Sequence, residues 1–394
     1  MGSDISRVCF VGIYGHNQDE VLRQGLERRG ISLSEVRVPQ RSLSEAKAER
    51  RLPVRTMRAT MNWFDGAPGW LFPFLVVATL LVHTVVTTAA VLGNLGDLRR
   101  ADVIVVPHMG DTSVFVAKPF AVLFDTPLVY FSHNGLYFTL VRNRGIYPED
   151  SVAGKFLFAL DLLVQRLSDR VVVFSQESAD RFSEAFGLPA ETYEVMYIKV
   201  VESNFDTSIE PAPEFESDVL YWGNFLPHHG PDTMVEAAAA LPDAEFVFVG
   251  ESDKRQGVVD HADRVGAENV SFPGFVSLSE LVQYVKGARV VLGPMGDNPQ
   301  TEFTIGTKVA EASYLEKAIA VADQPGTSEV FDHRETAYLV EPGDADALAA
   351  GVEEILGDDD LRHRLEDGAA DVYRRHFSVD RAGERFVEIA ASAR

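Results

Sequence analysis

The sequence has very little cysteine and no excess of positive charge. Its single cysteine, Cys9, excludes a disulfide within the chain and argues against a cysteine-based zinc site. There are 36 basic residues and 59 acidic ones, a formal net charge of −23, so we expect no basic surface for nucleic acid. The first fifteen residues lack a basic region and an Ala-x-Ala cleavage site. They are expected to begin a domain strand and not a signal peptide.

Lysine is scarce, and most of the positive charge comes from arginine. Lysine occurs only at Lys47, Lys118, Lys155, Lys199, Lys254, Lys286, Lys308 and Lys317. Many carboxylates with few lysines are typical of halophilic cytoplasmic proteins, because carboxylates hold hydration and concentrated salt screens their repulsion. The alternative is an ordinary acidic enzyme.

The chain is long enough for two domains. It has 394 residues, of which 46% are hydrophobic, and this fits two cores of about 180 to 200 residues each. Short apolar runs alternate with amphipathic ones, and the pattern restarts after a Pro- and Glu-rich stretch without periodicity. We therefore expect an N-terminal domain at 1–206, a linker at 207–217, a C-terminal domain at 218–376 and a final helix at 377–394.

The alternation predicts the fold class. The expected strands lie at 7–14, 32–38, 101–107, 126–132, 169–175, 217–223, 244–250, 268–274, 288–294, 317–323 and 336–342. Apolar strands separated by helices are typical of parallel sheets that are covered on both faces. The prediction is an α/β protein with two facing Rossmann-like, doubly wound domains, whose C-terminal helix crosses back to the first domain. Ligands of such domains bind at the carboxyl ends of the strands.

Two motifs in the first half fall at such strand ends. Gly12 and Gly15 lie in VGIYGHN, where a glycine turn before a helix would offer amides to an anion; a tight turn without a ligand is the alternative. His133 follows the apolar run PLVYFS, beside Asn134 and Gly135. We expect it to face a ligand, although a lone histidine is more often structural.

Two further motifs lie in the second half. YWGNFLPHHGP places Gly223, Asn224 and His229 between a strand and a helix, where a diphosphate would meet amides and an imidazole. The pair His228 and His229 also suggests a metal, but adjacent histidines rarely chelate one ion and no carboxylate cluster accompanies them.

The segment TIGTKVAEA carries the last motif, a glycine-containing loop that leads into a helix. Amides from Thr304, Ile305, Gly306 and Thr307 can hold phosphate or sugar hydroxyls, and Lys308 brings positive charge. Glu311, one turn later, can accept both hydroxyls of a ribose. The alternative is an amphipathic helix with a Lys–Glu pair three residues apart.

Together these segments resemble the retaining glycosyltransferase family 4 (group 1 glycosyltransferases), most strongly from residue 218 to 377. The similar segments include PLVYFSHNG, FVFVGE, VSFPGFVSLSELVQYVKGARVVLGP and GTKVAEA. The resemblance implies the GT-B fold and transfer of a sugar from a nucleotide donor without a metal or other cofactor. It implies that Glu311 binds the donor ribose, that Gly306 lies in the loop that reads the sugar, and that His133 faces that sugar. Gly12 and Gly15 would lie near the phosphates.

The sequence departs from the family pattern at the phosphates. The usual glutamate eight residues before Glu311 is Phe303, and the usual Arg and Lys of the phosphate loop align with Asn224 and His229. We expect Lys308 to supply the missing charge and to act with His133 in catalysis. Two alternatives are a catalytically silent sugar-nucleotide-binding partner in a glycosylation complex and a sugar-nucleotide epimerase, although no motif supplies the acidic groups that an epimerase needs.

A long apolar segment interrupts the first half, because residues 66–96 contain no Asp, Glu, Lys or Arg. Its core at 70–92 is long enough for a hydrocarbon layer of about 30 Å. A single crossing would separate the strands at 32–38 and 101–107, so we expect a membrane-contacting in-plane helix or re-entrant helix pair, with a buried helix as the alternative. The expected partners are a nucleotide sugar, a polyprenyl- or dolichyl-linked acceptor, and the inner face of the cell membrane.

Overall fold

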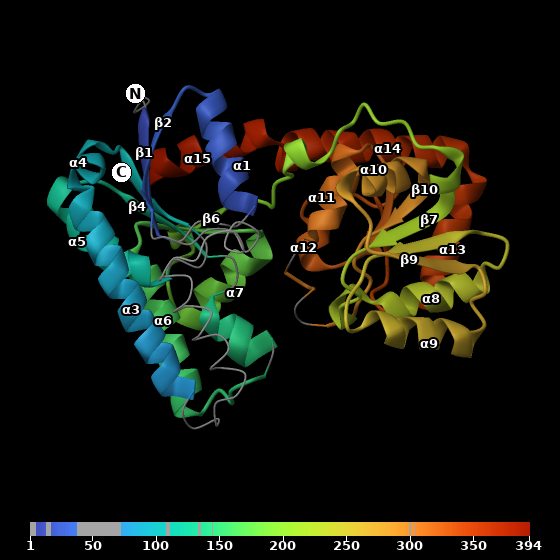
Figure 1. The fold of residues 1–394 in the computed structure, drawn as a ribbon, viewed down its shortest axis with the longest axis horizontal. Coiled ribbons are helices and arrows are strands. Elements are labelled where there is room, and N and C mark those ends of the chain that lie inside the picture. Colours follow the sequence, from blue (N-terminus) through green and yellow to red (C-terminus); the bar gives the residue numbers. More distant parts are fainter. Residues whose placement is uncertain are drawn as a thin grey trace. The chain divides into compact units, whose positions relative to one another are not determined.

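The computed structural model describes residues 5–12, 17–37, 72–107, 111–132, 135–143, 145–298, 301–303 and 305–394. It divides into two compact units (Figure 1). The first unit comprises Met1–Val173, Ala179–Met196 and Ala382–Arg394, and the second comprises Phe174–Ser178 and Tyr197–Arg381. The domain limits expected from the sequence, 1–206 and 218–376, stay predictions.

The first unit is built on a six-stranded parallel sheet in the order β2-β1-β3-β4-β5-β6. Its strands are β1 (Arg7–Gly12), β2 (Ser32–Arg37), β3 (Val103–Val106), β4 (Leu128–Phe131), β5 (Arg170–Val173) and β6 (Tyr193–Val195). Alternate residues of β1 enter two separate cores: Cys9 and Val11 on one face, Val8 and Phe10 on the other. Both faces are therefore covered, which explains why the strands have near-continuous apolar sequences.

Helices cover the first sheet on both faces (Figure 1). They are α1 (Asn17–Arg28), α3 (Phe72–Gly93), α4 (Leu95–Arg100), α5 (Asp111–Phe124), α6 (Val152–Leu167) and α7 (Gln176–Phe186), joined by α15 (Val379–Ser392) from the end of the chain. Ser151 caps α6 by accepting a hydrogen bond from the Gly154 amide at 3.0 Å, which fixes where that helix begins.

The second unit repeats this design with the strand order β12-β11-β10-β7-β8-β9, again parallel throughout. Its strands are β7 (Ser217–Trp222), β8 (Phe246–Val249), β9 (Val270–Gly274), β10 (Ala288–Leu292), β11 (Ala318–Ala322) and β12 (Tyr338–Val340). Its helices are α8 (Pro231–Ala240), α9 (Arg255–Val265), α10 (Leu278–Gly287), α11 (Thr307–Tyr314), α12 (Pro325–Ser328), α13 (Ala345–Gly357) and α14 (Asp359–Val372). The doubly wound α/β class predicted for both halves is confirmed.

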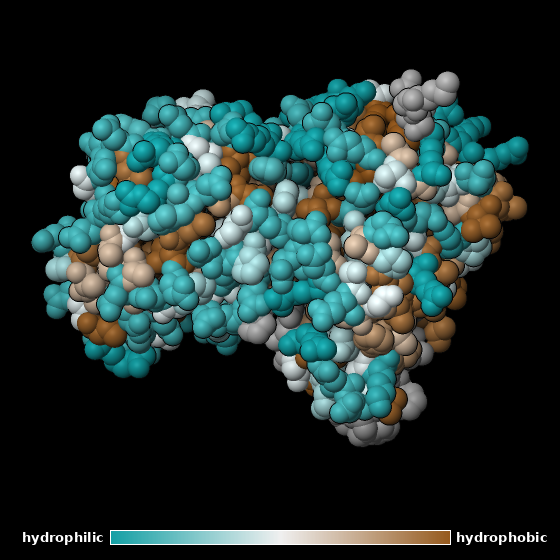
Figure 2. Space-filling view, turned by 180° about the vertical axis from the view of Figure 1, so that it is seen from behind, coloured by the Kyte–Doolittle hydropathy of each residue, from teal (hydrophilic) through white to brown (hydrophobic). Residues whose placement is uncertain are grey.

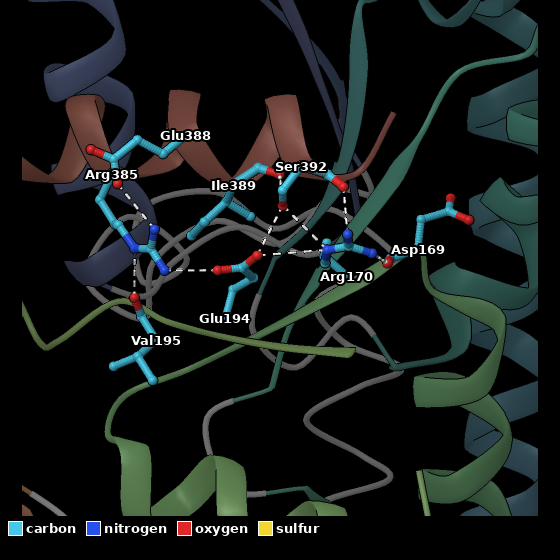
Figure 3. Close-up of polar contacts among 8 residues, drawn as sticks. All are labelled: Asp169, Arg170, Glu194, Val195, Arg385, Glu388, Ile389 and Ser392. Atoms are coloured by element: carbon cyan, nitrogen blue, oxygen red, sulfur yellow. Dashed lines mark hydrogen bonds and ion pairs between the residues drawn. The ribbon is translucent and has the colours of Figure 1, made fainter. Parts of the chain in front are cut away.

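The C-terminal helix α15 belongs to the first unit, as the sequence predicts. Phe386, Ile389 and Ala390 are buried in the core under β1 and β3. A polar network fixes the same helix on β5 and β6 (Figure 3). In it, Arg385 donates to the Glu194 carboxylate at 2.7 Å and to the Val195 carbonyl at 2.9 Å.

Residues 72–93 of the apolar segment form one continuous helix, α3, and not a helix pair. The helix packs along α5, and Val91 is buried in the first core. Leu81, Val82 and Val85 are 62%, 61% and 68% exposed. Hydrophobic residues also gather on the first unit in the space-filling view (right in Figure 2). Within the described part of the chain, no helix combines the length and apolarity needed to cross a bilayer.

Candidate active site

The residues predicted from the second half meet at the carboxyl edge of the second sheet, where β7 ends and α11 begins. Gly223 directly follows β7 and has a φ of +150°. A Cβ at this position would lie 3.1 Å from both the Lys308 Nζ and the Tyr221 hydroxyl. Glycine is therefore needed here for two reasons: its backbone angle, and the space that Lys308 occupies.

Lys308 lies in the first turn of α11 and is only 7% exposed. Its Nζ lies 4.8 Å from the centroid of the Tyr221 ring and 3.3 Å from the His229 Nδ1. Burial lowers the pKa of Lys308 to about 8, and the nearby Glu311 opposes this shift. Among the described residues, no carboxylate lies within ion-pair distance of the Lys308 ammonium. An ammonium that is desolvated and supported by a ring and an imidazole attracts an anion strongly.

Glu311 lies one turn further along α11. Its Oε2 accepts a hydrogen bond from the Trp222 indole Nε1 at 3.3 Å. Burial raises the pKa of Glu311 to about 7, while the indole and Lys308 act in the opposite direction. Because a carboxylate can accept about four hydrogen bonds, Glu311 keeps acceptor capacity for hydroxyl groups of a ligand.

His229 ends a short 3-10 turn, Pro227–His229, before α8. Its carbonyl accepts a hydrogen bond from the Met295 amide at 2.9 Å, and a Cβ on the following Gly230 would come within 2.6 Å of the Gly296 amide nitrogen. Burial, followed by the charges of Lys308 and His228, lowers the pKa of His229 to about 3. The imidazole is therefore neutral at physiological pH.

The remaining predicted residues of this edge differ in their position and exposure. Gly306 caps α11 in an extended conformation, and Thr307 is the first, exposed residue of the helix. Ile305 is buried in the core, so only its backbone is available to a ligand. Asn224 is exposed, and its carbonyl accepts a hydrogen bond from Ser252 at 2.7 Å. Thr304 lies outside the described residues.

In the first unit, the structure describes fewer of the predicted site residues. Gly12 ends β1 with a φ of +134°, and a Cβ there would lie 3.0 Å from the Ser113 hydroxyl. Gly15 and His133 lie outside the described residues, so their assignments stay predictions.

The sequence does not indicate three further side chains at these edges. Tyr221 and Trp222 end an apolar strand, and only their polar tips distinguish them from core residues. Asp161 of α6 is 3% exposed and accepts hydrogen bonds from the amides of Leu136 and Tyr137 at 3.2 and 2.8 Å. It thereby caps the turn that follows the predicted His133. Its one sequence signal is a carboxylate within the apolar run FALDLLV.

Among the described residues, no group of three or more His, Cys, Asp or Glu side chains is placed to hold a metal ion. The expectation that His228 and His229 bind no metal stays a prediction.

The fold and this edge define the class of the protein. Two parallel doubly wound units, with buried charged groups at the carboxyl ends of the second unit's strands, are typical of α/β proteins that bind a nucleotide at that edge. Comparison with known families agrees. The family model described as "Glycosyl transferases group 1" matches residues 203–372. The family model described as "Glycosyl transferase 4-like domain" matches residues 20–198. The chain belongs to the GT-B, family 4-like group 1 glycosyltransferases.

Individual relatives are distant. The chain is 24% identical over 264 residues to the uncharacterized glycosyltransferase MJ1607 of Methanocaldococcus jannaschii, covering 63% of this chain and 65% of the relative. It is 27% identical over 180 residues to the alpha-D-kanosaminyltransferase of Streptomyces kanamyceticus, covering 43% and 44%. The chain thus spans less than two thirds of the length of these two relatives. The solved structure of Anabaena Alr3699/HepE in complex with UDP is similar in fold, with a TM-score of 0.64, 16% identity and coverage of 98% and 100%.

Proposed function

We propose that this protein is a retaining, metal-independent glycosyltransferase that uses a nucleotide-diphosphate sugar as donor. The observation that carries the proposal is the buried Lys308 ammonium, which lies at the carboxyl edge of the second sheet with a neutral imidazole and an aromatic ring as its neighbours. Burying a cation without a carboxylate partner costs free energy. A bound diphosphate would offset that cost.

The proposed reaction needs stabilisation of charge more than it needs a base. The bond between the sugar C1 and the diphosphate oxygen breaks, and negative charge gathers on the leaving diphosphate. Lys308 and His229 would donate hydrogen bonds to it, together with the amides at the start of α11. The acceptor hydroxyl oxygen forms the new bond to C1 on the face that the diphosphate leaves, and its proton passes to a phosphate oxygen. His133 is proposed to face the donor sugar.

Glu311 is proposed to anchor the nucleoside. Its carboxylate is held by the Trp222 indole at 3.3 Å and keeps acceptor capacity for the two ribose hydroxyls. The complex of Alr3699/HepE with UDP supports a nucleotide ligand for this fold. The alternative, a catalytically silent binding partner, would bind the nucleotide sugar but would neither transfer nor hydrolyse the sugar.

The acceptor is proposed to be lipid-linked or otherwise carried by a membrane. Exposed apolar side chains occur on three helices of the first unit, α3, α5 and α6. They are Leu81, Val82, Val85, Leu92, Val122, Leu123, Val152, Phe156 and Leu163. Such a surface fits peripheral attachment to the inner face of the cell membrane. The acidic composition further suggests activity at high salt.

The test is a donor screen followed by transfer assays. Thermal shift with UDP-, GDP-, ADP-, CDP- and dTDP-sugars identifies the donor, because a bound ligand raises the unfolding temperature. Transfer is then measured with a polyprenyl-phosphate acceptor and with a soluble aminoglycoside-type acceptor. We expect transfer to the lipid, with retained anomeric configuration and unchanged rate in EDTA. Binding without transfer or hydrolysis would favour the silent partner, and transfer only to the soluble acceptor would reject the proposed acceptor class.

A further inference from the structure

Two donors converge on one nitrogen of His229. The Tyr221 hydroxyl oxygen lies 3.0 Å from Nδ1, and the Lys308 Nζ lies 3.3 Å from the same atom. A protonated lysine has three N–H donors and no acceptor. Nδ1 must therefore act as the acceptor of this contact, and it carries no proton.

The Tyr221 hydroxyl is also oriented. Tyr221 is fully buried, and because Nδ1 of His229 carries no proton, the Tyr221 hydroxyl is the donor of the 3.0 Å contact. The Phe225 ring packs beside the Tyr221 ring at 5.7 Å between centroids, and Phe225 is itself 1% exposed with a φ of +53°.

A neutral imidazole that accepts at Nδ1 carries its proton on Nε2. We propose that Tyr221 is a positioning residue that, together with Lys308, fixes His229 as the Nε2–H tautomer and aims this neutral donor at the diphosphate of the donor. His229 is half-buried, and none of the described residues pairs with its Nε2. This inference rests on the proposed function for the identity of the ligand, but the tautomer itself is a property of the free protein.

The arrangement divides two tasks between neighbouring side chains. Lys308 supplies the positive charge, and His229 supplies one N–H donor with a fixed orientation. The titratable groups around the imidazole are Tyr221, Lys308, His228 and, through Lys308, Glu311. Lys308 and His228 both disfavour an imidazolium, so His229 donates without adding charge.

The tautomer is tested directly by ¹⁵N NMR of histidine-labelled wild-type protein without ligand, with the His229 signal assigned by its loss in the His229→Asn variant. We expect the pattern of a neutral ring with a proton on Nε2 and not on Nδ1. A proton on Nδ1, or a charged ring at pH 7, would overturn the proposal. This measurement needs no donor, so it is independent of the proposed function.

Substitutions then test the role in binding, with the best of UDP, GDP, ADP, CDP and dTDP as probe. The amide nitrogen of Gln lies near the place of Nε2, whereas that of Asn lies near the place of Nδ1. His229→Gln should keep the affinity within about threefold of wild type, and His229→Asn should lose about tenfold. Equal affinities of these two variants would contradict the assignment.

Tyr221→Phe keeps the ring under Lys308 but removes the hydroxyl. We expect the affinity for the same probe to fall by about threefold to tenfold, the value of one neutral hydrogen bond. The matched control is Tyr193→Phe in the first unit, which removes a buried hydroxyl that contacts Gln165 at 2.6 Å. The control should leave binding unchanged. Unchanged binding in Tyr221→Phe would reject its positioning role.

If no nucleoside diphosphate binds the wild type, the proposed function is wrong. The NMR measurement then still decides whether the proposed tautomer of His229 is correct.

Discussion

The carboxyl edges of the two sheets are built differently. In the second unit, Tyr221, His229 and Lys308 contact one another, and Trp222 holds Glu311. In the first unit, the hydroxyls of Ser113, next to Gly12, and of Ser132, directly after β4, are buried and have no partner among the described residues.

This difference indicates which ligand each of the two edges would bind. A network whose members bond each other is in place before the ligand arrives, and it suits a donor whose charged part must be positioned closely. An unpaired buried hydroxyl costs about 1–3 kcal/mol, and this cost is relieved if a substrate supplies the partner. We therefore expect the second edge to bind the donor and the first to bind the acceptor.

The largest expected effect comes from removing the ribose anchor. Glu311→Ala should weaken binding of the nucleoside diphosphate by about 100-fold, because both ribose hydroxyls lose their acceptor. Calorimetric titration measures this, and circular dichroism checks that the fold is kept. Glu268→Ala, an exposed residue of the same unit, is the control. Undiminished binding by Glu311→Ala would reject the site.

The next effect concerns pH and has opposite signs for binding and stability. The pKa of Lys308 falls from 10.5 in the unfolded chain to about 8 in the folded one, so the unfolded state binds more protons between these values. The free energy of unfolding should therefore rise from pH 8 to pH 10 through this group, while diphosphate affinity falls. Chemical denaturation and calorimetry at pH 7 and pH 9.5 measure both. In Lys308→Met both slopes should shrink; slopes equal to wild type would show that Lys308 is not responsible.

The third effect tests the apolar surface that distinguishes the first unit. Val85→Asp places a charge on a side chain that is 68% exposed on α3. We expect co-sedimentation with phosphatidylglycerol and phosphatidylethanolamine vesicles to weaken by about tenfold, because a valine no longer enters the lipid. Val265→Asp, on α9 of the second unit, should change nothing. Equal loss in both variants, or no vesicle binding by the wild type, would remove the basis for a membrane-borne acceptor.

The smallest expected effect is a difference between the two edges in how a lost hydroxyl changes the free energy of unfolding. Ser113→Ala removes an unpaired buried hydroxyl and should leave the protein equally stable or raise its free energy of unfolding by up to about 1 kcal/mol. Tyr221→Phe breaks a bonded pair and should lower it by about 1 kcal/mol. Urea denaturation of both variants gives the comparison. A loss of stability in Ser113→Ala would mean that its hydroxyl has a partner in the free protein.

The fold was largely predictable because its signal is repeated along the chain. Eleven apolar runs separated by helical stretches predict parallel sheets, and the structure places a strand in each. The short edge strand β6 (Tyr193–Val195) was missed, because three residues carry no periodicity. The helices α9 and α14 also have a weak sequence signal, because their surfaces are mostly polar.

The candidate site was predictable only in part. Lys308 and Glu311 share one helix, so their spacing in the sequence already places them together. The contacts of Lys308 with His229, 79 residues away, and of Glu311 with Trp222, 89 residues away, depend on the packing of α11 against the end of β7. No local pattern reports such contacts, and the burial that shifts the pKa of each group follows from them.

The most direct test of the account is the affinity of Lys308→Met for the nucleoside diphosphate that binds the wild type best, measured by calorimetry at pH 7. Lys286→Met is the matched control, since its ammonium contacts the carbonyls of Thr207 and Ile209 at 3.0 and 2.6 Å. We expect a loss of about 10- to 100-fold for Lys308→Met and none for the control. Wild-type affinity in Lys308→Met would contradict the claim that this buried ammonium binds the diphosphate.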